Sequence, residues 1–157
     1  MSAKEIGGML KADELRLCVA VSRFNDLLTK QLLGGAIDCF VRHGGKEDSI
    51  TVIWVPGANE LPMVIQKAVQ SGKYDAAVAL GVVVEGSTKH ADLINSQVSK
   101  TLGSVALASS VPVINGVVAA DNLEQAIERC GTKAGNKGWS AVQAAIEMAN
   151  VYKQLDK

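Results

Sequence analysis

The chain has 157 residues, of which 48% are hydrophobic and 20% charged, and 16 basic side chains balance 16 acidic ones. This length suits one core, the apolar content excludes a disordered chain, and the balanced charge argues against nucleic-acid binding. We expect one cytoplasmic domain over residues 1–157, with an N-terminal extension over 1–13 and neither a membrane span nor a signal peptide. The three cysteines lack metal-ligand spacing, which predicts reduced thiols and no metal site.

Strand and helix patterns alternate along the first half of the chain. Residues 15–22 are rich in valine and leucine and predict a buried strand, and residues 25–43 carry apolar side chains at helical spacing. Asn25 is the expected cap of that helix. The β-branched run 50–55 predicts a second strand, and residues 60–71 predict a second helix with a proline in its first turn.

The second half begins with the same alternation. Residues 75–84 are apolar on both faces and predict the third strand, residues 88–108 a helix, and residues 111–118 the fourth strand. Strands of this kind are buried on both sides, and the helices between them supply right-handed crossovers. The predicted fold is therefore α/β, a three-layer α/β/α sandwich with a four-stranded parallel sheet of the flavodoxin-like type.

A glycine-rich loop separates the last two helical stretches. One helix begins near Asp121, with Glu124 placed for a capping box, and the final helix covers residues 139–155. The loop, residues 131–138, superficially resembles a phosphate-binding loop. It lacks the G-x-x-x-x-G-K-[ST] pattern and no strand precedes it, so we reject a nucleoside triphosphate site there.

The rarer side chains gather at the predicted carboxyl ends of the strands, where open parallel sheets bind ligands. Phe24, one of two phenylalanines, follows the first strand, and Glu60 follows the second. His90, one of two histidines, follows the third, and the fourth strand ends in the segment that begins at Asn115. Aromatic and ionisable residues among glycines at one edge indicate a small-molecule pocket.

Each of these residues also has an ordinary structural explanation. Ser87 and Thr88 open a helix, where free N–H groups attract an anion, but either hydroxyl would also serve as a plain helix cap. His90 would equally be an inert surface residue, and Glu60 a favourable acid in a first helical turn. Phe24 would equally be a hydrophobic staple packed back onto the sheet. The single residues leave both interpretations open.

The order of four motifs is more specific than any one of them. S-R-F-N follows the first strand, V-P-G-A-x-E-L-P the second and a G-x-T-x-H loop the third, and E-Q-A-I-E-R-C-G-T-K-A-G-N-K-G comes later. These segments, within residues 15–153, resemble the 6,7-dimethyl-8-ribityllumazine synthase family. That family condenses 5-amino-6-(D-ribitylamino)uracil with 3,4-dihydroxy-2-butanone 4-phosphate in riboflavin biosynthesis, and it uses no cofactor and no metal.

The resemblance implies roles for the matching polar residues. His90 would be the catalytic residue, shuttling protons during imine formation and phosphate loss, work that suits a pKa near neutrality. Ser87, Thr88 and Arg129 would bind the phosphate, with a bidentate fork from the guanidinium. Lys137 would lie nearby and contact the substrate or steady the site.

The resemblance also implies a set of residues that contact the substrates. Phe24 would stack on the pyrimidine ring, Glu60 would hydrogen-bond the ribityl chain, and backbone groups of residues 82–84 would read the edge of the heterocycle. The full expected set is Phe24, Ala58, Asn59, Glu60, Val82, Val83, Val84, Asn115 and Lys137.

In this family the pocket straddles two subunits of a pentamer, and the neighbour contributes Arg129 and the position of Asn115. The compact loop over residues 131–138 resembles members whose pentamers assemble into a hollow 60-subunit icosahedral shell. We therefore expect a homo-oligomer, either a pentamer or a shell, that acts on small molecules and binds neither nucleic acid nor membrane.

Several pocket positions depart from the family pattern. Asn59 and Asn115 stand where aromatic residues are usual, and Glu85 stands where a basic residue is usual. The other departures are Val82, Ala91 and Ala119. They leave open a shell-forming or ligand-binding relative, natural or engineered, with weak or absent catalysis. The retained chemical residues favour the working enzyme, and an unrelated flavodoxin-like electron carrier would not account for the loop motifs.

Overall fold

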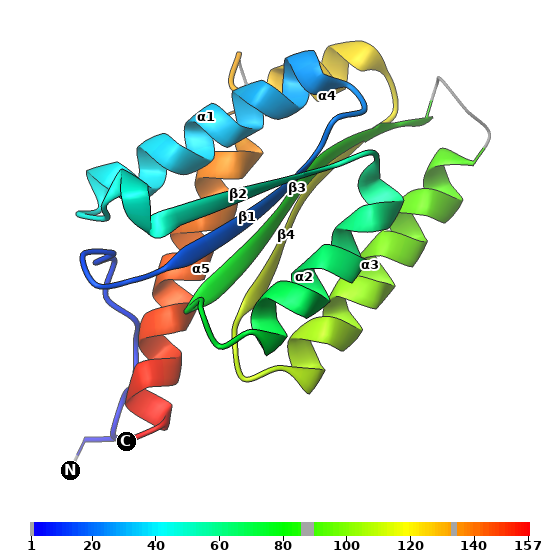
Figure 1. The fold of residues 1–157 in the computed structure, drawn as a ribbon. Coiled ribbons are helices and arrows are strands. Elements are labelled where there is room, and N and C mark those ends of the chain that lie inside the picture. Colours follow the sequence, from blue (N-terminus) through cyan, green and yellow to red (C-terminus); the bar gives the residue numbers. More distant parts are fainter. Residues whose placement is uncertain (1, 86–89, 133–134) are drawn as a thin grey trace.

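A computed structural model describes residues 2–85, 90–132 and 135–157 of the chain. Its centre is the predicted four-stranded parallel sheet, in which the strands have the order β2-β1-β3-β4 (Figure 1). The strands are β1 (Leu17–Ser22), β2 (Ile50–Val55), β3 (Ala76–Val84) and β4 (Val113–Ala120). β1 and β3 are buried at every position, because helices cover both faces of the sheet.

The helices form the two outer layers of a three-layer α/β/α sandwich (Figure 1). One face of the sheet carries α1 (Asp26–Arg42), α4 (Leu123–Arg129) and α5 (Lys137–Leu155). The other face carries α2 (Leu61–Gln70) and α3 (Ala91–Ala108). Two short 3₁₀ helices flank β2, namely η1 (Glu47–Ser49) and η2 (Ala58–Glu60).

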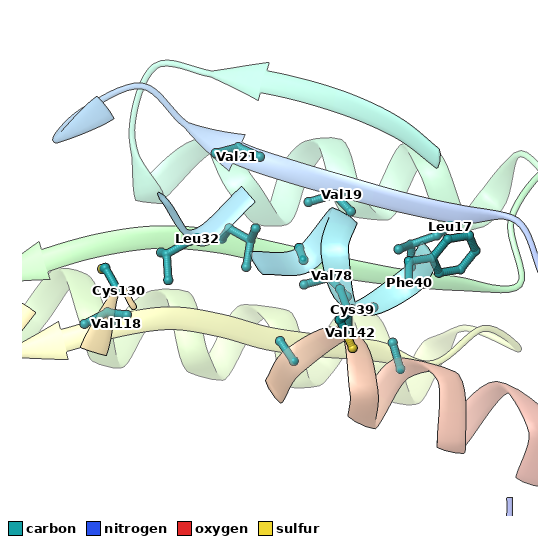
Figure 2. Close-up of a cluster of buried hydrophobic side chains, with 14 of the residues drawn as sticks. Leu17, Val19, Val21, Leu32, Cys39, Phe40, Val78, Val118, Cys130 and Val142 are labelled. Atoms are coloured by element: carbon teal, nitrogen blue, oxygen red, sulfur yellow. The ribbon is translucent and has the colours of Figure 1, made fainter. Parts of the chain in front are cut away.

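The period of two along the strands divides the buried side chains between two clusters. Figure 2 shows Leu17, Val19 and Val21 of β1 in one cluster with side chains from α1 and α5. Cys18 and Ala20, which alternate with them, belong to the cluster under α2 and α3. The three cysteines are buried free thiols, and desolvation raises the pKa of each to about 11.

The fourth strand lies two residues further along than its predicted range. It pairs with β3 from Ala77 opposite Val113 to Val84 opposite Ala120. Its start follows Pro112, whose carbonyl accepts a hydrogen bond from the Ala77 N–H but whose nitrogen has none to donate. Asn115 is the third residue of this strand and lies opposite Ala79, so its predicted place at the carboxyl end of the sheet was wrong.

The predicted helix caps were also partly wrong. Asn25 occupies the N-cap position of α1 but makes no side-chain capping bond. α4 is capped by Asn122, whose side chain accepts from the Gln125 N–H at 2.9 Å, and not by the predicted residue before it. α5 begins two residues earlier than expected because the Asn136 side chain accepts hydrogen bonds from the first N–H groups of the helix.

The N-terminal segment lies along the second half of α5 (Figure 1). The Asn150 amide donates to the carbonyls of Met9 (2.5 Å) and Lys11 (3.0 Å), and the Gln154 amide donates to that of Gly7 (2.6 Å). Within the described ranges, no helix is long and apolar enough to cross a membrane.

Candidate active site

A cavity of about 190 Å³ lies at the carboxyl end of the sheet, where the sequence predicted a pocket. We call it the Phe24 pocket. It is lined by Phe24, Gly57, Ala58, Asn59, Glu60, Val82, Val83, Val84 and Ile94. The structure thus brings together the predicted residues that follow β1, those of η2 and the end of β3. Most of the lining is apolar, as in small-molecule sites generally.

Two backbone hydrogen bonds hold Phe24 beside η2. The Arg23 N–H donates to the Val55 carbonyl at 2.8 Å, and the Phe24 N–H donates to the Pro56 carbonyl at 3.1 Å. The Phe24 side chain nevertheless remains 67% exposed. A staple packed onto the sheet would be buried, so this ring is presented to the pocket and not to the core.

Asn25 links the segment after β1 to the end of β3. Its backbone is left-handed (φ 63°), a conformation that asparagine tolerates better than most residues. Its Nδ2 donates to the Val82 carbonyl at 3.2 Å. The side chain that was expected to cap α1 instead fixes Phe24 relative to the strand that forms the other side of the pocket.

The carboxylate of Glu60 enters the pocket from η2. The Glu60 N–H donates to the Gly57 carbonyl at 3.2 Å, which closes the turn. A Cβ on Gly57 would lie 3.2 Å from Glu60 Oε1, so a glycine there leaves room for the carboxylate. Glu60 is half-buried, and it supplies a strong hydrogen-bond acceptor within a largely apolar lining.

The remaining predicted substrate residues line a different cavity, of about 370 Å³, on the α5 side of β4. We call it the Arg129 pocket. Its lining residues are Ile114, Asn115, Arg129, Asn136, Lys137, Ser140, Ala141 and Ala144. No described residue lines both pockets. Within one chain, the predicted site is therefore divided into two parts.

The polar side chains of the Arg129 pocket are held by their surroundings. Arg129 Nη1 donates to the Ala119 carbonyl at 2.6 Å, and its cation lies in the last turn of α4, where the helix dipole favours positive charge. Asn115 lines the pocket, but its side chain bonds toward α3 on the other face of the sheet: Nδ2 donates to Ser99 Oγ at 3.1 Å, while Oδ1 accepts from the Val117 N–H at 2.9 Å. Lys137, an exposed residue, begins α5.

His90 lies immediately before α3, close to the Phe24 pocket in sequence and structure. Its carbonyl accepts a hydrogen bond from the Ile94 N–H at 2.9 Å, and Ile94 lines the pocket. One helical turn thus separates the exposed His90 from the cavity. The predicted phosphate ligands Ser87 and Thr88 lie outside the described residues.

Three carboxylates from different segments meet near the start of α3. A hydrogen bond with Asp92, together with the negative charges of Asp92 and Asp121, raises the pKa of the Glu85 carboxyl above its usual value. A small cavity beside them, of about 60 Å³, also contacts Ala91 and Ala119. Three of these five residues, Glu85, Ala91 and Ala119, are departures from the family pattern, and the three carboxylates supply no positive charge for a phosphate.

Sequence analysis missed several residues of the two pockets. Gly57 and Ile94 line the Phe24 pocket, and Asn136 and Ser140 line the Arg129 pocket. Ile94 belongs to the apolar stripe of α3, and its place four residues after His90 was the available signal. In the parts of the chain that the structure describes, no three His, Cys, Asp or Glu side chains form a group that could hold a metal ion.

Comparison with known proteins agrees with the arrangement of the motifs. The family model of 6,7-dimethyl-8-ribityllumazine synthase matches residues 14–153. The chain belongs to this family. It is 56% identical to the 6,7-dimethyl-8-ribityllumazine synthase of Chlorobaculum tepidum over 155 residues, which cover 99% of this chain and 100% of the relative.

Two further relatives carry the same name. The protein of Chlorobaculum parvum is 54% identical over 99% of this chain and 99% of its own length. That of Chlorobium limicola is 52% identical over 99% of this chain and 100% of its own length. Family membership makes the chain a transferase of riboflavin biosynthesis with the flavodoxin-like fold of the family.

Proposed function

We propose that this chain condenses 5-amino-6-(D-ribitylamino)uracil with 3,4-dihydroxy-2-butanone 4-phosphate to give 6,7-dimethyl-8-ribityllumazine, with release of phosphate and water. Each active site combines the Phe24 pocket of one subunit with the Arg129 pocket of its neighbour. The observation that carries this proposal is the division of the predicted site into two cavities with complementary chemistry.

The Phe24 pocket suits the pyrimidine substrate. The exposed Phe24 ring offers a face for stacking, and the Glu60 carboxylate can accept hydrogen bonds from ribityl hydroxyls. Backbone groups of residues 82–84 line the pocket and are the candidates to hydrogen-bond the edge of the heterocycle. The Val82 carbonyl already accepts a hydrogen bond from Asn25, which leaves it one lone pair.

The Arg129 pocket suits the phosphorylated substrate. No lysine or arginine is among the described residues that line the Phe24 pocket, so a phosphate there needs positive charge from elsewhere. Arg129 and Lys137 supply two cations that line one cavity. Ser87 and Thr88 belong to the same phosphate site in this proposal, and Asn115 borders the shared cavity from the neighbour's β4.

His90 is the proposed proton shuttle. Imine formation and phosphate loss each require a proton to move, and an imidazole can accept and return protons near neutral pH. Its place one helical turn from the Phe24 pocket supports this role. Asn59 and Glu85, which depart from the family pattern, would then change the affinity for substrate without abolishing the reaction.

The proposal requires an assembly, because one subunit alone holds only half of each site. We propose a homopentamer, or a 60-subunit shell built from pentamers, of one catalytic domain per chain in the cytoplasm. A cyclic arrangement supplies one composite site at each interface, since head-to-tail contacts in a ring repeat the same pairing.

The deciding experiment combines a mass measurement in solution with an assay of lumazine formation on the same sample. Both substrates are supplied, and the product is followed by its absorbance, with Arg129→Ala as the matched variant. We expect turnover by a pentamer or a larger assembly, and a raised KM for the four-carbon phosphate in the variant. Assembly without turnover would contradict the catalytic proposal, and turnover by a monomer would contradict the composite site.

A further inference from the structure

One carboxamide, that of Asn136, joins three segments of the Arg129 pocket. Its Nδ2 donates to the Gln31 carbonyl on α1 at 2.9 Å. Its Oδ1 accepts from the N–H groups of Gly138 (2.8 Å) and Trp139 (3.1 Å) in the first turn of α5. The amide therefore uses its donor and its acceptor at once, and because these are separate atoms it can join two elements.

The surroundings of this amide fit it closely. Asn136 also forms an isolated antiparallel bridge with Cys130, the residue directly after Arg129. A Cβ on Gly35 of α1 would overlap the Asn136 carboxamide, and a Cβ on Gly131 would lie 3.1 Å from its Nδ2. Two glycines thus leave the space that the amide occupies.

Asn136 is close in the chain to both cations of the pocket. Arg129 ends α4 just before the bridge, and Lys137 begins α5 just after the cap. A cation in the first turn of a helix opposes the helix dipole, and α5 has no acidic residue there to offset it. The fixed turn therefore holds Lys137 in a position that its charge alone would disfavour.

We infer that Asn136 is a positioning residue, which sets the placement of Arg129 and Lys137 and through them the affinity for the phosphorylated substrate. This inference rests on the proposed function, because it takes these two cations as the phosphate-binding pair. Asn136 acts through the turn it closes, and a direct contact with substrate is not required.

Two substitutions test the amide: one replaces the side chain itself, and the other changes a residue of α1 that packs against it. Asn136→Ser keeps an oxygen that can cap α5, since serine is a good N-cap, but its side chain is too short to bond Gln31 as well. Gly35→Ala crowds the amide from α1 and leaves every residue of the pocket lining unchanged. Gly34→Ala is the matched control, because a Cβ there meets open space among the described atoms of the same helix.

The measurements separate positioning from a plain structural role. In Asn136→Ser and Gly35→Ala we expect KM for the four-carbon phosphate to rise about tenfold, with kcat and KM for the pyrimidine within about twofold of wild type. The dissociation constant of inorganic phosphate, measured by calorimetry, should rise in parallel. Gly34→Ala should match wild type in all of these, and circular dichroism confirms that each variant is folded.

Several outcomes would overturn the inference. An unchanged phosphate affinity in folded Asn136→Ser would do so, as would an equal loss of affinity for both substrates or a change in melting temperature alone. If wild type binds inorganic phosphate but forms no lumazine, the proposed function fails while the calorimetric comparison still decides the role of Asn136. Wild type that binds no phosphate would contradict the inference as well.

Discussion

At the scale of single residues, Phe24 shows how an aromatic side chain can be fixed without being buried. Its backbone is held by the Pro56 carbonyl directly after β2, and its neighbour Asn25 is held by β3 through the Val82 carbonyl. The ring itself stays 67% exposed. A ring in that state contributes little to the core, so its orientation is available for binding.

Phe24→Ala should therefore weaken pyrimidine binding and leave stability nearly unchanged. We expect KM for the pyrimidine substrate to rise by a factor that corresponds to about 1 kcal/mol, the usual size of an aromatic stacking contact. The melting temperature should stay close to that of wild type. Leu27→Ala is the control, because that side chain is 78% exposed and lies outside both pocket linings. An unchanged pyrimidine KM in Phe24→Ala would remove the ring from substrate binding.

Asn25 allows its backbone and side-chain contributions to be separated. Asn25→Ala puts alanine, which disfavours the left-handed conformation, at φ 63° and also removes the hydrogen bond to Val82. We expect it to lower the free energy of unfolding by about 1–2 kcal/mol. Asn25→Gly removes the same hydrogen bond but tolerates the left-handed conformation. Urea unfolding should give the order wild type, then the glycine variant, then the alanine variant. An alanine variant more stable than the glycine variant would contradict this account.

At the scale of elements, three segments bring carboxylates together at the start of α3. Glu85 follows β3, Asp92 lies in the first turn of α3, and Asp121 follows β4. The raised pKa of Glu85 means that folding disfavours its ionised form. The folded protein therefore loses stability as the pH rises from the usual pKa of a glutamate through this raised pKa.

Glu85→Gln removes that repulsion and should change the pH dependence of stability. The variant should melt at a higher temperature than wild type at neutral pH, and the difference should vanish in acid, where wild-type Glu85 is protonated. Glu5→Gln, an exposed carboxyl of the N-terminal segment, should show no such dependence. A stability difference that persists unchanged into acid would show that the repulsion between carboxylates is not its cause.

Strands were predictable wherever local pattern decides them. The β-branched run of β2 was predicted over its observed range, Ile50–Val55, and β1 and β3 begin within two residues of prediction. Helix caps were not predictable in this way, because a cap depends on which group a short polar side chain hydrogen-bonds. Asn25 bonds a carbonyl 57 residues away, and no local pattern signals that choice.

The candidate site was predictable at the carboxyl ends of β1, β2 and β3, where Phe24 and Glu60 were expected and are found together. The strand-end rule failed for Asn115, because that residue is the third of β4 and lies opposite Ala79, well before the carboxyl end of β3. The separation of Arg129 and Lys137 from Phe24 follows from the packing of α5 against β4, which connects residues far apart in sequence. The resemblance to a family anticipated that separation for Arg129 and Asn115 but not for Lys137.

At the scale of the whole molecule, β4 is an edge strand with a cavity beside it. Exposed Asn115 and the Arg129 pocket lie along this edge, while the Phe24 pocket opens between the segments after β1 and β2 and the end of β3. A subunit placed against the edge can bring its own Phe24 pocket to the neighbour's cations. Under the proposal, this arrangement makes catalysis dependent on assembly, since each subunit supplies only half of each site.

Mixed assemblies test this dependence directly. Under the proposal, His90→Ala damages the half-site that contains the Phe24 pocket, and Arg129→Ala damages the half supplied by the neighbour. Each variant alone should assemble and turn over slowly. Co-expressed in equal amounts with two different affinity tags and purified through both, they should recover about a quarter of wild-type turnover, because in a ring about one interface in four pairs two undamaged halves. Activity no higher than that of either variant alone would place both residues in a site within one subunit.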